Sequence, residues 1–286
     1  MAVTPAACRA VARAGGAAVV DLRAVSGGCI GEVWCAALED GRRLAVKTGD
    51  AAGSLDVEGY MLDYLARTNT VPVPEVLHAA PDLLVMSWVE ADGRLTAAAE
   101  QHAAELLAAL HGIAAEAYGH ERDTLIGALR QPNPWCQSWV AFFREHRLLH
   151  IGRDALDCGA LARDTYKRLE DFCIRKLDAY IDEPDRPSLI HGDMWGGNVL
   201  CADGRIAAFI DPAIYHADAE IELAFSTLFG TYGDVFFRTY DELRPIRPGF
   251  FEARRDIYNL YPLLVHTRLF GGHYGTQVDH ILKRFL

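Results

Sequence analysis

The chain has 286 residues, of which 51% are hydrophobic and 23% are charged, a balance typical of a globular protein long enough for two lobes. Its net charge of −11, without a cluster of Lys and Arg, argues against nucleic acid or an anionic membrane as a partner, because both bind concentrated positive charge. The seven cysteines form no Cys-x-x-Cys pair, and no run approaches the ~18 apolar residues of a membrane span, so we expect a cytoplasmic protein without structural zinc or an export signal.

The first motif is a glycine-rich stretch over residues 26–33, between two runs of alternating apolar residues. It fits Gly-x-Gly-x-x-Gly-x-Val with Ser26 in the place of the first glycine. The segment with Gly28, Cys29 and Gly31 is therefore predicted to bind phosphates through backbone N–H groups, which glycine leaves open to approach. A plain hairpin turn would show the same pattern, so this interpretation depends on the motifs that follow.

The next strand, residues 43–47, ends in Lys47 and is similar to the Val-Ala-Ile-Lys of a kinase third strand. A helix is predicted from a cap at Ser54 to about residue 67. Glu58 lies on the apolar stripe of this helix, where a carboxylate is costly unless it is paired. We therefore predict an ion pair between Glu58 and Lys47, with Lys47 also holding nucleotide phosphates. A Glu58 that faces water at the edge of the stripe is the alternative.

A break at residues 71–74 leads to a continuous apolar strand over residues 82–89. Its position is that of a kinase hinge, so backbone groups of Ser87, Trp88 and Val89 are predicted to bind the adenine edge, with Met86 behind the ring. An ordinary buried strand would look the same. The polar turn at 90–94 is predicted to separate a nucleotide-binding lobe, residues 1–90, from a C-terminal lobe, residues 91–286.

The second part of the chain has an almost wholly helical pattern. Helices are expected over residues 97–117, over a stripe that starts at Trp135 and includes Trp139, Phe142 and Phe143, and over about 155–181, 219–229 and 250–284. Only a hairpin from about 188 to 211 interrupts them. The sequence thus predicts an α+β fold, with an antiparallel N-terminal sheet, one main N-terminal helix and a helical C-terminal lobe that carries the catalytic loop.

That hairpin carries the most specific motif, His191-Gly192-Asp193, with Asn198 five residues after the Asp and Asp211 after another apolar strand. Kinases use this order for a base and two metal ligands. We therefore predict that Asp193 accepts the proton of a substrate hydroxyl, that Asn198 and Asp211 bind Mg²⁺, and that His191 braces the loop. Gly192 replaces the Arg of protein kinases and Asp-Pro-Ala replaces Asp-Phe-Gly, which favours small-molecule kinases. A solvated hairpin is the alternative, since Asp, Gly and Asn are common in turns.

With these residues in place, the chain resembles the fructosamine kinase (ketosamine-3-kinase) family, in the group of the protein-kinase-like fold that includes aminoglycoside phosphotransferases and choline kinases. The specific part is His-Gly-Asp-Met-Trp-Gly-Gly-Asn at 191–198, similar to the family's His-Gly-Asp-Leu-Trp-Ser-Gly-Asn, with Trp195 as the distinguishing residue. Residues 27–30, 125–127 and 131–148 also resemble the family. Glu222 stands where the family usually has Asp, and we predict that Glu220 and Glu222 anchor the catalytic loop. Thr124 stands where Asn is frequent, so an unusual sugar is expected if that loop contacts it.

The resemblance implies a cytoplasmic enzyme of protein deglycation, which transfers the γ-phosphoryl of ATP, with Mg²⁺, to the 3-hydroxyl of a ribulosamine or fructosamine. Trp195, with Trp135 as a second candidate, is predicted to stack on the sugar or its apolar substituent, and the alternative for Trp135 is a place in the core, as is common for a Trp on a helical stripe. The resemblance also implies a redox-linked disulfide between two subunits through Cys29, so a monomer and a homodimer both stay open.

Two other classes of protein fit parts of the pattern. An aminoglycoside or choline-type phosphotransferase would need clustered acceptor-side carboxylates for a polycation or a quaternary amine. A nucleotide-binding pseudokinase would keep the fold without turnover, although Lys47, Glu58, Asp193, Asn198 and Asp211 are all chemically competent. A protein kinase is disfavoured because no Ala-Pro-Glu element follows Asp211.

Overall fold

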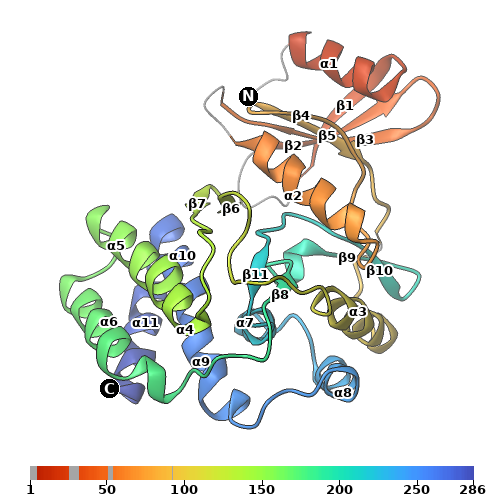
Figure 1. The fold of residues 1–286 in the computed structure, drawn as a ribbon. Coiled ribbons are helices and arrows are strands. Elements are labelled where there is room, and N and C mark those ends of the chain that lie inside the picture. The colour runs from red at the N-terminus through yellow and green to blue at the C-terminus, as the bar shows by residue number, and fades with distance from the viewer. Residues whose placement is uncertain (1–4, 26–31, 51–53, 92) are drawn as a thin grey trace.

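The computed structural model describes residues 5–25, 32–50, 54–91 and 93–286. Its N-terminal part is an antiparallel sheet of five strands in the order β1-β2-β3-β5-β4. The strands are β1 (Val19–Val25), β2 (Glu32–Leu38), β3 (Arg43–Thr48), β4 (Val76–Ala80) and β5 (Leu83–Ser87), and the helices of this part are α1 (Pro5–Gly15) and α2 (Leu55–Thr68). Figure 1 shows the sheet and both helices together at one end of the molecule.

Strand β5 is apolar on both of its faces because a helix covers each of them. Successive side chains of a strand point to opposite faces. Val85 packs in one cluster with Val11 of α1, whereas Leu84 and Met86 pack in another with Leu62 of α2. The continuous apolar run that predicted this strand therefore reflects burial on two sides.

Helix α2 lies close to the sheet, and a glycine makes this approach possible. A Cβ atom at Gly59 would lie 2.6 Å from Cβ of Ala79 on β4. The helix begins one residue after Ser54, as predicted, but the Ser54 side chain makes no capping hydrogen bond. Its backbone carbonyl accepts from the N–H of Val57 and Glu58 instead. The close packing at Gly59 brings the adjacent Glu58 toward the edge of β3.

The rest of the chain is helical apart from three two-stranded units, β6 (Thr124–Ile126) with β7 (Leu129–Gln131), β9 (Val199–Ala202) with β10 (Arg205–Phe209), and β8 (Ser188–Ile190) with β11 (Tyr215–Ala217). The α-helices are α3 (Ala97–Leu110), α4 (Trp139–Phe142), α5 (His150–Asp157), α6 (Arg163–Arg175), α7 (Glu220–Leu228), α8 (Asp234–Leu243), α9 (Arg255–Tyr258), α10 (Leu260–Phe270) and α11 (Tyr274–Phe285). Two π-helical turns, Phe143–Leu149 and Phe250–Arg254, and the 3₁₀ turns Leu177–Ala179 and Gly196–Asn198 complete the list. Figure 1 shows α4, α5, α6, α10 and α11 at the end of the molecule away from the sheet.

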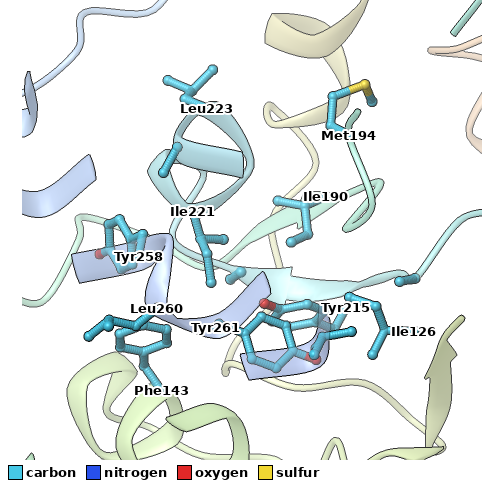
Figure 2. Close-up of a cluster of buried hydrophobic side chains, with 14 of the residues drawn as sticks. Ile126, Phe143, Ile190, Met194, Tyr215, Ile221, Leu223, Tyr258, Leu260 and Tyr261 are labelled. Atoms are coloured by element: carbon cyan, nitrogen blue, oxygen red, sulfur yellow. The ribbon is translucent and has the colours of Figure 1, made fainter. Parts of the chain in front are cut away.

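A single large core holds the helices against the strands that flank the predicted catalytic loop. Figure 2 shows Ile190 of β8, Tyr215 of β11 and Ile221 of α7 among these buried side chains, with Leu260 from α10. Ile190, which directly precedes the His-Gly-Asp motif, is 1% exposed. The loop after β8 therefore starts from a rigid, fully buried strand.

Several predicted helix boundaries are wrong. The helix expected over 97–117 ends at Leu110, because Gly112 follows its cap and residues 114, 118 and 119 form isolated bridges with neighbouring strands and loops. Helix α4 begins only at Trp139, where the Ser138 hydroxyl accepts from the N–H of Ala141 at 3.1 Å, so Trp135 lies outside it.

The C-terminal helical run is also divided more finely than predicted. The expected helix over 250–284 is interrupted after Phe270, where Gly271 and Gly272 both have positive φ angles. Such angles suit glycine and end a helix. The expected helix over 155–181 resolves into the end of α5, α6 and a 3₁₀ turn, while α8 and the β6–β7 hairpin were not predicted.

Between β5 and α3, residues 88–96 link the sheet to the helical part. The division of the chain into lobes at residues 90 and 91 stays a prediction. Among the residues that the structure describes, no helix has the length and apolar character needed to cross a membrane.

Candidate active site

Lys47 lies at the centre of an ion-pair cluster that joins the sheet to the helical part. Its Nζ atom is 2.7 Å from Oε1 of Glu58 on α2 and 2.6 Å from Oδ1 of Asp211, which follows β10. Burial favours the neutral amine, but the two carboxylates outweigh it and hold the pKa of Lys47 above its usual value. The predicted pair of Lys47 with Glu58 is therefore present, and Asp211 completes it with a second carboxylate.

Asp193 and Asn198 are held together at the start of the β9 strand. The Asn198 side-chain amide donates to Oδ2 and to the backbone carbonyl of Asp193, both at 2.9 Å. Burial raises the pKa of Asp193 to about 7, against the lowering effect of the Asn198 hydrogen bond. Because the Asn198 nitrogen faces Asp193 on both contacts, its side-chain oxygen is left as an acceptor for another group.

Gly192 allows two chain segments of the site to meet. Its φ angle is +89°, and a Cβ atom there would lie 2.1 Å from the carbonyl oxygen of Ala213. The Ala213 N–H in turn donates to the carbonyl of His191 at 2.7 Å. An Arg at this position, as in protein kinases, would collide with the backbone. Asp211 itself has a φ of 54°, a conformation that non-glycine residues adopt rarely and that is often found at functional sites.

Glu222 on α7 anchors the catalytic loop by accepting hydrogen bonds from its backbone. One of its oxygens, Oε1, accepts from the N–H of Gly192 at 2.6 Å, and the other accepts from the N–H of His191 at 3.3 Å and from Nε2 of His111 at 2.7 Å. Since an ionised carboxylate cannot donate, Nε2 of His111 carries a proton, and Nδ1 lies 2.7 Å from the Tyr240 hydroxyl. Burial opposes the charge, but the His111 hydrogen bond outweighs it and lowers the pKa of Glu222. The predicted anchoring by Glu222 is confirmed.

The corresponding prediction for Glu220 is wrong. Glu220 accepts from Nε of Arg254 at 2.6 Å and lies 3.1 Å from the Arg247 guanidinium. These partners hold the start of α7 against residues 247–254, so the Glu220 carboxylate does not reach the catalytic loop. Burial of the carboxylate is outweighed by the two arginines, which lower its pKa.

His191 does not contact the acceptor side. It is fully buried, and its Nδ1 accepts a long hydrogen bond of 3.4 Å from the N–H of Asp193. Burial lowers the pKa of His191, so its ring is neutral at pH 7. These features fit the bracing role that its position in the motif predicted.

A cavity of about 720 Å³ opens beside Asp193. Its wall is largely apolar and aromatic, and it includes Trp195, Phe229, His266 and Phe270. The Trp195 ring lies over the catalytic loop, because a Cβ atom at Gly197 would lie 2.3 Å from it. Among the described residues that line the cavity, Asp193 is the single carboxylate.

Trp135 lies apart from this cavity. It is 52% exposed, its ring is 6.0 Å from that of His216, and it is not among the cavity-lining residues. Trp135 therefore does not line this cavity, and its contact with a substrate stays a prediction.

A buried polar network behind the site explains several residues whose role the sequence did not disclose. Gln131 donates to the Ala213 carbonyl at 3.1 Å and to the Thr124 hydroxyl at 2.8 Å, and Thr124 donates to the Ile214 carbonyl at 3.2 Å. Thr124 is 1% exposed. It positions the chain after Asp211, whereas Ile126 and Gly127 of the same loop line the cavity beside Asp193, so the expectation of an unusual sugar stays a prediction.

Arg147 is a fully buried charged residue of this network. Its guanidinium donates to Oδ1 of Asn133 at 2.6 Å and to the Pro132 carbonyl at 2.8 Å while it lies 3.9 Å from the centre of the Tyr215 ring. A cation is tolerated there because carbonyl oxygens and an aromatic face surround it. Spacing in the sequence gave no indication of this burial.

Two backbone N–H groups of the predicted adenine-binding segment already form hydrogen bonds within the N-terminal part of the chain. The N–H of Ser87 donates to the Glu75 carbonyl at 2.8 Å, and that of Trp88 donates to the Arg43 carbonyl at 3.3 Å. Within the described hydrogen bonds, the N–H of Val89 donates to no acceptor. An adenine contact through an N–H is therefore best supported at Val89.

The predicted phosphate-binding residues Gly28, Cys29 and Gly31 lie outside the described residues, and so does the proposed disulfide through Cys29. Strands β1 and β2 on either side pair up to Val25 and Val33. These predictions therefore stay predictions.

The chain is similar to known kinases over nearly its whole length. A sequence model of the family described as fructosamine kinase matches residues 4–286. A probable ketoamine kinase of Synechocystis is 36% identical over 279 residues, which cover 94% of this chain and 91% of that protein. The chloroplastic protein-ribulosamine 3-kinase of Arabidopsis thaliana is 29% identical over 280 residues, covering 94% and 83%.

Solved structures agree with this assignment. The crystal structure of a candidate fructosamine-3-kinase from Thermobifida fusca has a TM-score of 0.87 and 34% identity, and covers 96% of each chain. The gentamicin complex of APH(2")-IIa, at 13% identity and a TM-score of 0.70, shares the fold alone. The predicted α+β, protein-kinase-like fold is thus confirmed. The chain belongs to the fructosamine kinase family.

Proposed function

We propose that this chain is an ATP-dependent ketosamine kinase that phosphorylates the 3-hydroxyl of a ribulosamine or fructosamine. The observation that carries the proposal is the position of Asp193, which lines the cavity and is held by Asn198. The names of the related ketoamine and ribulosamine kinases support the substrate class.

In the proposed reaction, the bond between the γ-phosphorus of ATP and the oxygen that bridges it to the β-phosphorus breaks, and a bond to the sugar hydroxyl oxygen forms. The hydroxyl proton passes to the Asp193 carboxylate, and ADP leaves. The Asn198 amide holds the Asp193 carboxylate at 2.9 Å, in position to accept this proton. Because the transition state is largely dissociative, fixed geometry matters more than base strength.

The residues of the site fit a magnesium ion. The side-chain oxygen of Asn198 is left free by the two hydrogen bonds that its nitrogen makes to Asp193, and the Asp211 side chain is 37% exposed. Mg²⁺ prefers such oxygen ligands and binds them together with substrate phosphates. When bound, the ion would neutralise phosphate charge, while Asn198 and Asp211 hold it in place.

The nucleotide would occupy the edge of the N-terminal sheet. Lys47 offers a fixed positive charge to the α- and β-phosphates, and Glu58 holds its side chain in place at 2.7 Å. Met86 of β5, and Val89 two residues after the end of that strand, would contact the adenine. The glycine-rich segment that includes Cys29 would cover the phosphates, as the family resemblance implies.

The cavity wall favours a ketosamine over an aminoglycoside. A polycationic antibiotic needs several acceptor-side carboxylates, whereas the described lining has one, Asp193, which the reaction itself uses. The aromatic wall around Trp195 suits a sugar with an apolar substituent. A cytoplasmic location, protein deglycation and the oligomeric state stay predictions.

The test is turnover by an Asp193→Asn variant, measured as ADP release with ATP, Mg²⁺ and ribulose-lysine. We expect a loss of at least ~10²-fold in kcat with little change in ATP affinity. Asp203→Asn is the matched control, since Asp203 is an exposed residue of the β9–β10 turn with a φ of 53° that Asn also tolerates. Turnover by Asp193→Asn equal to that of the wild type would refute the proposed base.

A further inference from the structure

We propose that the cavity beside Asp193 selects ketosamines whose amine carries an uncharged aliphatic or aromatic group, over those whose substituent ends in a negative charge. This inference rests on the proposed function, because it takes the reacting hydroxyl of a ketosamine to lie at Asp193. The amine substituent then extends along the rest of the cavity.

A chain of aromatic rings leads away from the catalytic loop. The Trp195 ring centre is 6.3 Å from that of Phe229, which is 5.0 Å from that of His266. His266 is in turn 5.5 Å from Phe270 and 5.0 Å from Tyr274. All five side chains line the cavity, and they come from the catalytic loop, the end of α7, α10 and the start of α11.

This wall carries no positive charge to pair with an anionic substituent. Among the described residues that line the cavity there is no Lys or Arg. His266 is neutral at pH 7, because burial lowers its pKa. Its Nδ1 lies 2.7 Å from the Pro262 carbonyl and must donate to it, which uses the ring's one N–H within the protein.

A cationic substituent is in a different position from an anionic one. Asp193, at the reacting end, is the single carboxylate of the described lining, but the faces of the aromatic rings attract a cation. An anionic terminus placed among the rings would lose part of its hydration and meet the negative faces of the rings, which disfavours its binding.

The cavity has room and apolar surface beyond what a sugar needs. Its volume of about 720 Å³ lies within the ~300–1,000 Å³ of sites that hold drug-sized molecules. Phe229 is 41% exposed and Phe270 is 50% exposed, so both rings keep apolar surface in water. An apolar substituent that covers these rings removes that surface from water, which favours its binding.

Three ribulose adducts of equal length test the charge preference. The amines are hexylamine, 6-aminohexanoate and 1,6-diaminohexane, attached through one amino group, so that the free end is neutral, negative or positive. We expect kcat/KM for the hexylamine adduct to exceed that of the 6-aminohexanoate adduct by ~10-fold or more, mainly through KM, and we expect the 1,6-diaminohexane adduct to exceed the 6-aminohexanoate adduct as well. Equal values for the hexylamine and 6-aminohexanoate adducts, or a preference for the negative end, would overturn the inference.

A further pair of substrates distinguishes the source of the apolar group. One is the ribulose adduct of phenethylamine, and the other is a peptide with a ribulosylated N-terminal Phe. Both should be better substrates than the 6-aminohexanoate adduct if a small amine and a peptide end are accepted alike. Turnover of the peptide alone would contradict selection by the cavity, because the small adduct presents the same ring.

Variants of the rim locate the effect. Phe270→Ala should reduce the ratio of kcat/KM for the hexylamine adduct to that for the methylamine adduct by ~3–10-fold, because the longer chain loses its apolar partner. The matched control is Phe251→Ala, which truncates a ring that is 46% exposed and packs on Phe237 and Phe250 away from the cavity. An unchanged ratio in Phe270→Ala would refute the placement.

The two proposals fail in different ways. If no ribulose adduct, including that of methylamine, stimulates ADP release, the ketosamine kinase itself is refuted and the inference falls with it. If every adduct is phosphorylated with the same kcat/KM, the kinase stands and only the selection by the aromatic wall is wrong.

Discussion

Replacing Glu222 with Gln should weaken the fold and the catalytic loop together. Oε1 of Glu222 accepts from Gly192, and Oε2 accepts from His191 and His111. A Gln side chain has one acceptor oxygen, so in either orientation an N–H group faces the NH₂ group of the amide. At least one short, charge-assisted hydrogen bond is then lost in a site that is 2% exposed.

The magnitude follows from these contacts. A hydrogen bond to a charged group contributes ~1.5–3 kcal/mol, and an unsatisfied buried donor adds to the loss, so we expect Glu222→Gln to lower the free energy of unfolding by about 2–4 kcal/mol. For a chain of this length, the melting temperature should fall by roughly 3–7 °C. Because Gly192 and Asp193 are adjacent, a shift of the loop moves the base, and a displacement of ~1 Å can reduce kcat by about 10²-fold.

Urea unfolding and saturating ADP-release assays measure the two effects separately. Glu183→Gln is the control, since Glu183 also accepts backbone hydrogen bonds, from Trp139 at 2.6 Å and Val140 at 3.2 Å, but at the start of α4. It should lose stability and keep its kcat. If Glu222→Gln were destabilised with an unchanged kcat, Glu222 would be only a structural residue, and our account of the loop would be wrong.

Three further variants test other contacts of the site. Gly192→Ala should lose ~10²-fold or more in kcat and about 2–4 kcal/mol in the free energy of unfolding, because its Cβ would meet the Ala213 carbonyl at 2.1 Å; wild-type activity and stability would contradict the close approach. Lys47→Met should reduce kcat/KM for ATP by ~10²-fold, because the phosphates lose a fixed cation, and an unchanged value would exclude Lys47 from the nucleotide site. His120 has a pKa that burial lowers from 6.5 to about 4, so the unfolded chain binds its proton first. Its contribution to stability is therefore complete above pH 6.5 and is lost as the pH falls toward 4, by up to ~3 kcal/mol. The fall in unfolding free energy between pH 7 and about pH 4.5 should be smaller in His120→Gln, and equal slopes would refute this.

The residues that the sequence identified are those whose chemistry depends on order along the chain. Lys47 ends a strand, Glu58 follows on the next helix, and their side chains meet at 2.7 Å. Asp193 and Asn198 are separated by a 3₁₀ turn, which local spacing predicts well, and their side chains are 2.9 Å apart. Short-range spacing thus identified the Lys47–Glu58 pair and the Asp193–Asn198 pair, whereas the contact of Lys47 with Asp211, 164 residues away, was not predicted.

The supporting contacts could not be predicted in this way. His111 meets Glu222 and Tyr240 across separations of 111 and 129 residues, and nothing local marks a histidine at a helix end as their partner. Arg147 lies in a segment whose sequence indicated only a resemblance to the family, yet it is fully buried. Both depend on tertiary packing, which periodicity alone does not reveal.

Some errors had a signal that could have been used. The β6–β7 hairpin turns at Gly127, whose φ is 57°, and the glycine after Leu-Ile was a turn marker in the sequence. Pro134 and Ser138 likewise mark a helix start after Trp135, where a helical spacing of aromatic residues was given more weight.

The most direct test of the central claim is ADP release by the purified protein with ATP and Mg²⁺, compared among ribulose-lysine, fructose-lysine, kanamycin and choline. We predict stimulation by one or both ketosamines and none by kanamycin or choline. Stimulation by kanamycin or choline alone would contradict the account and assign the chain to the other phosphotransferases, and ATP binding without turnover of any acceptor would favour a pseudokinase.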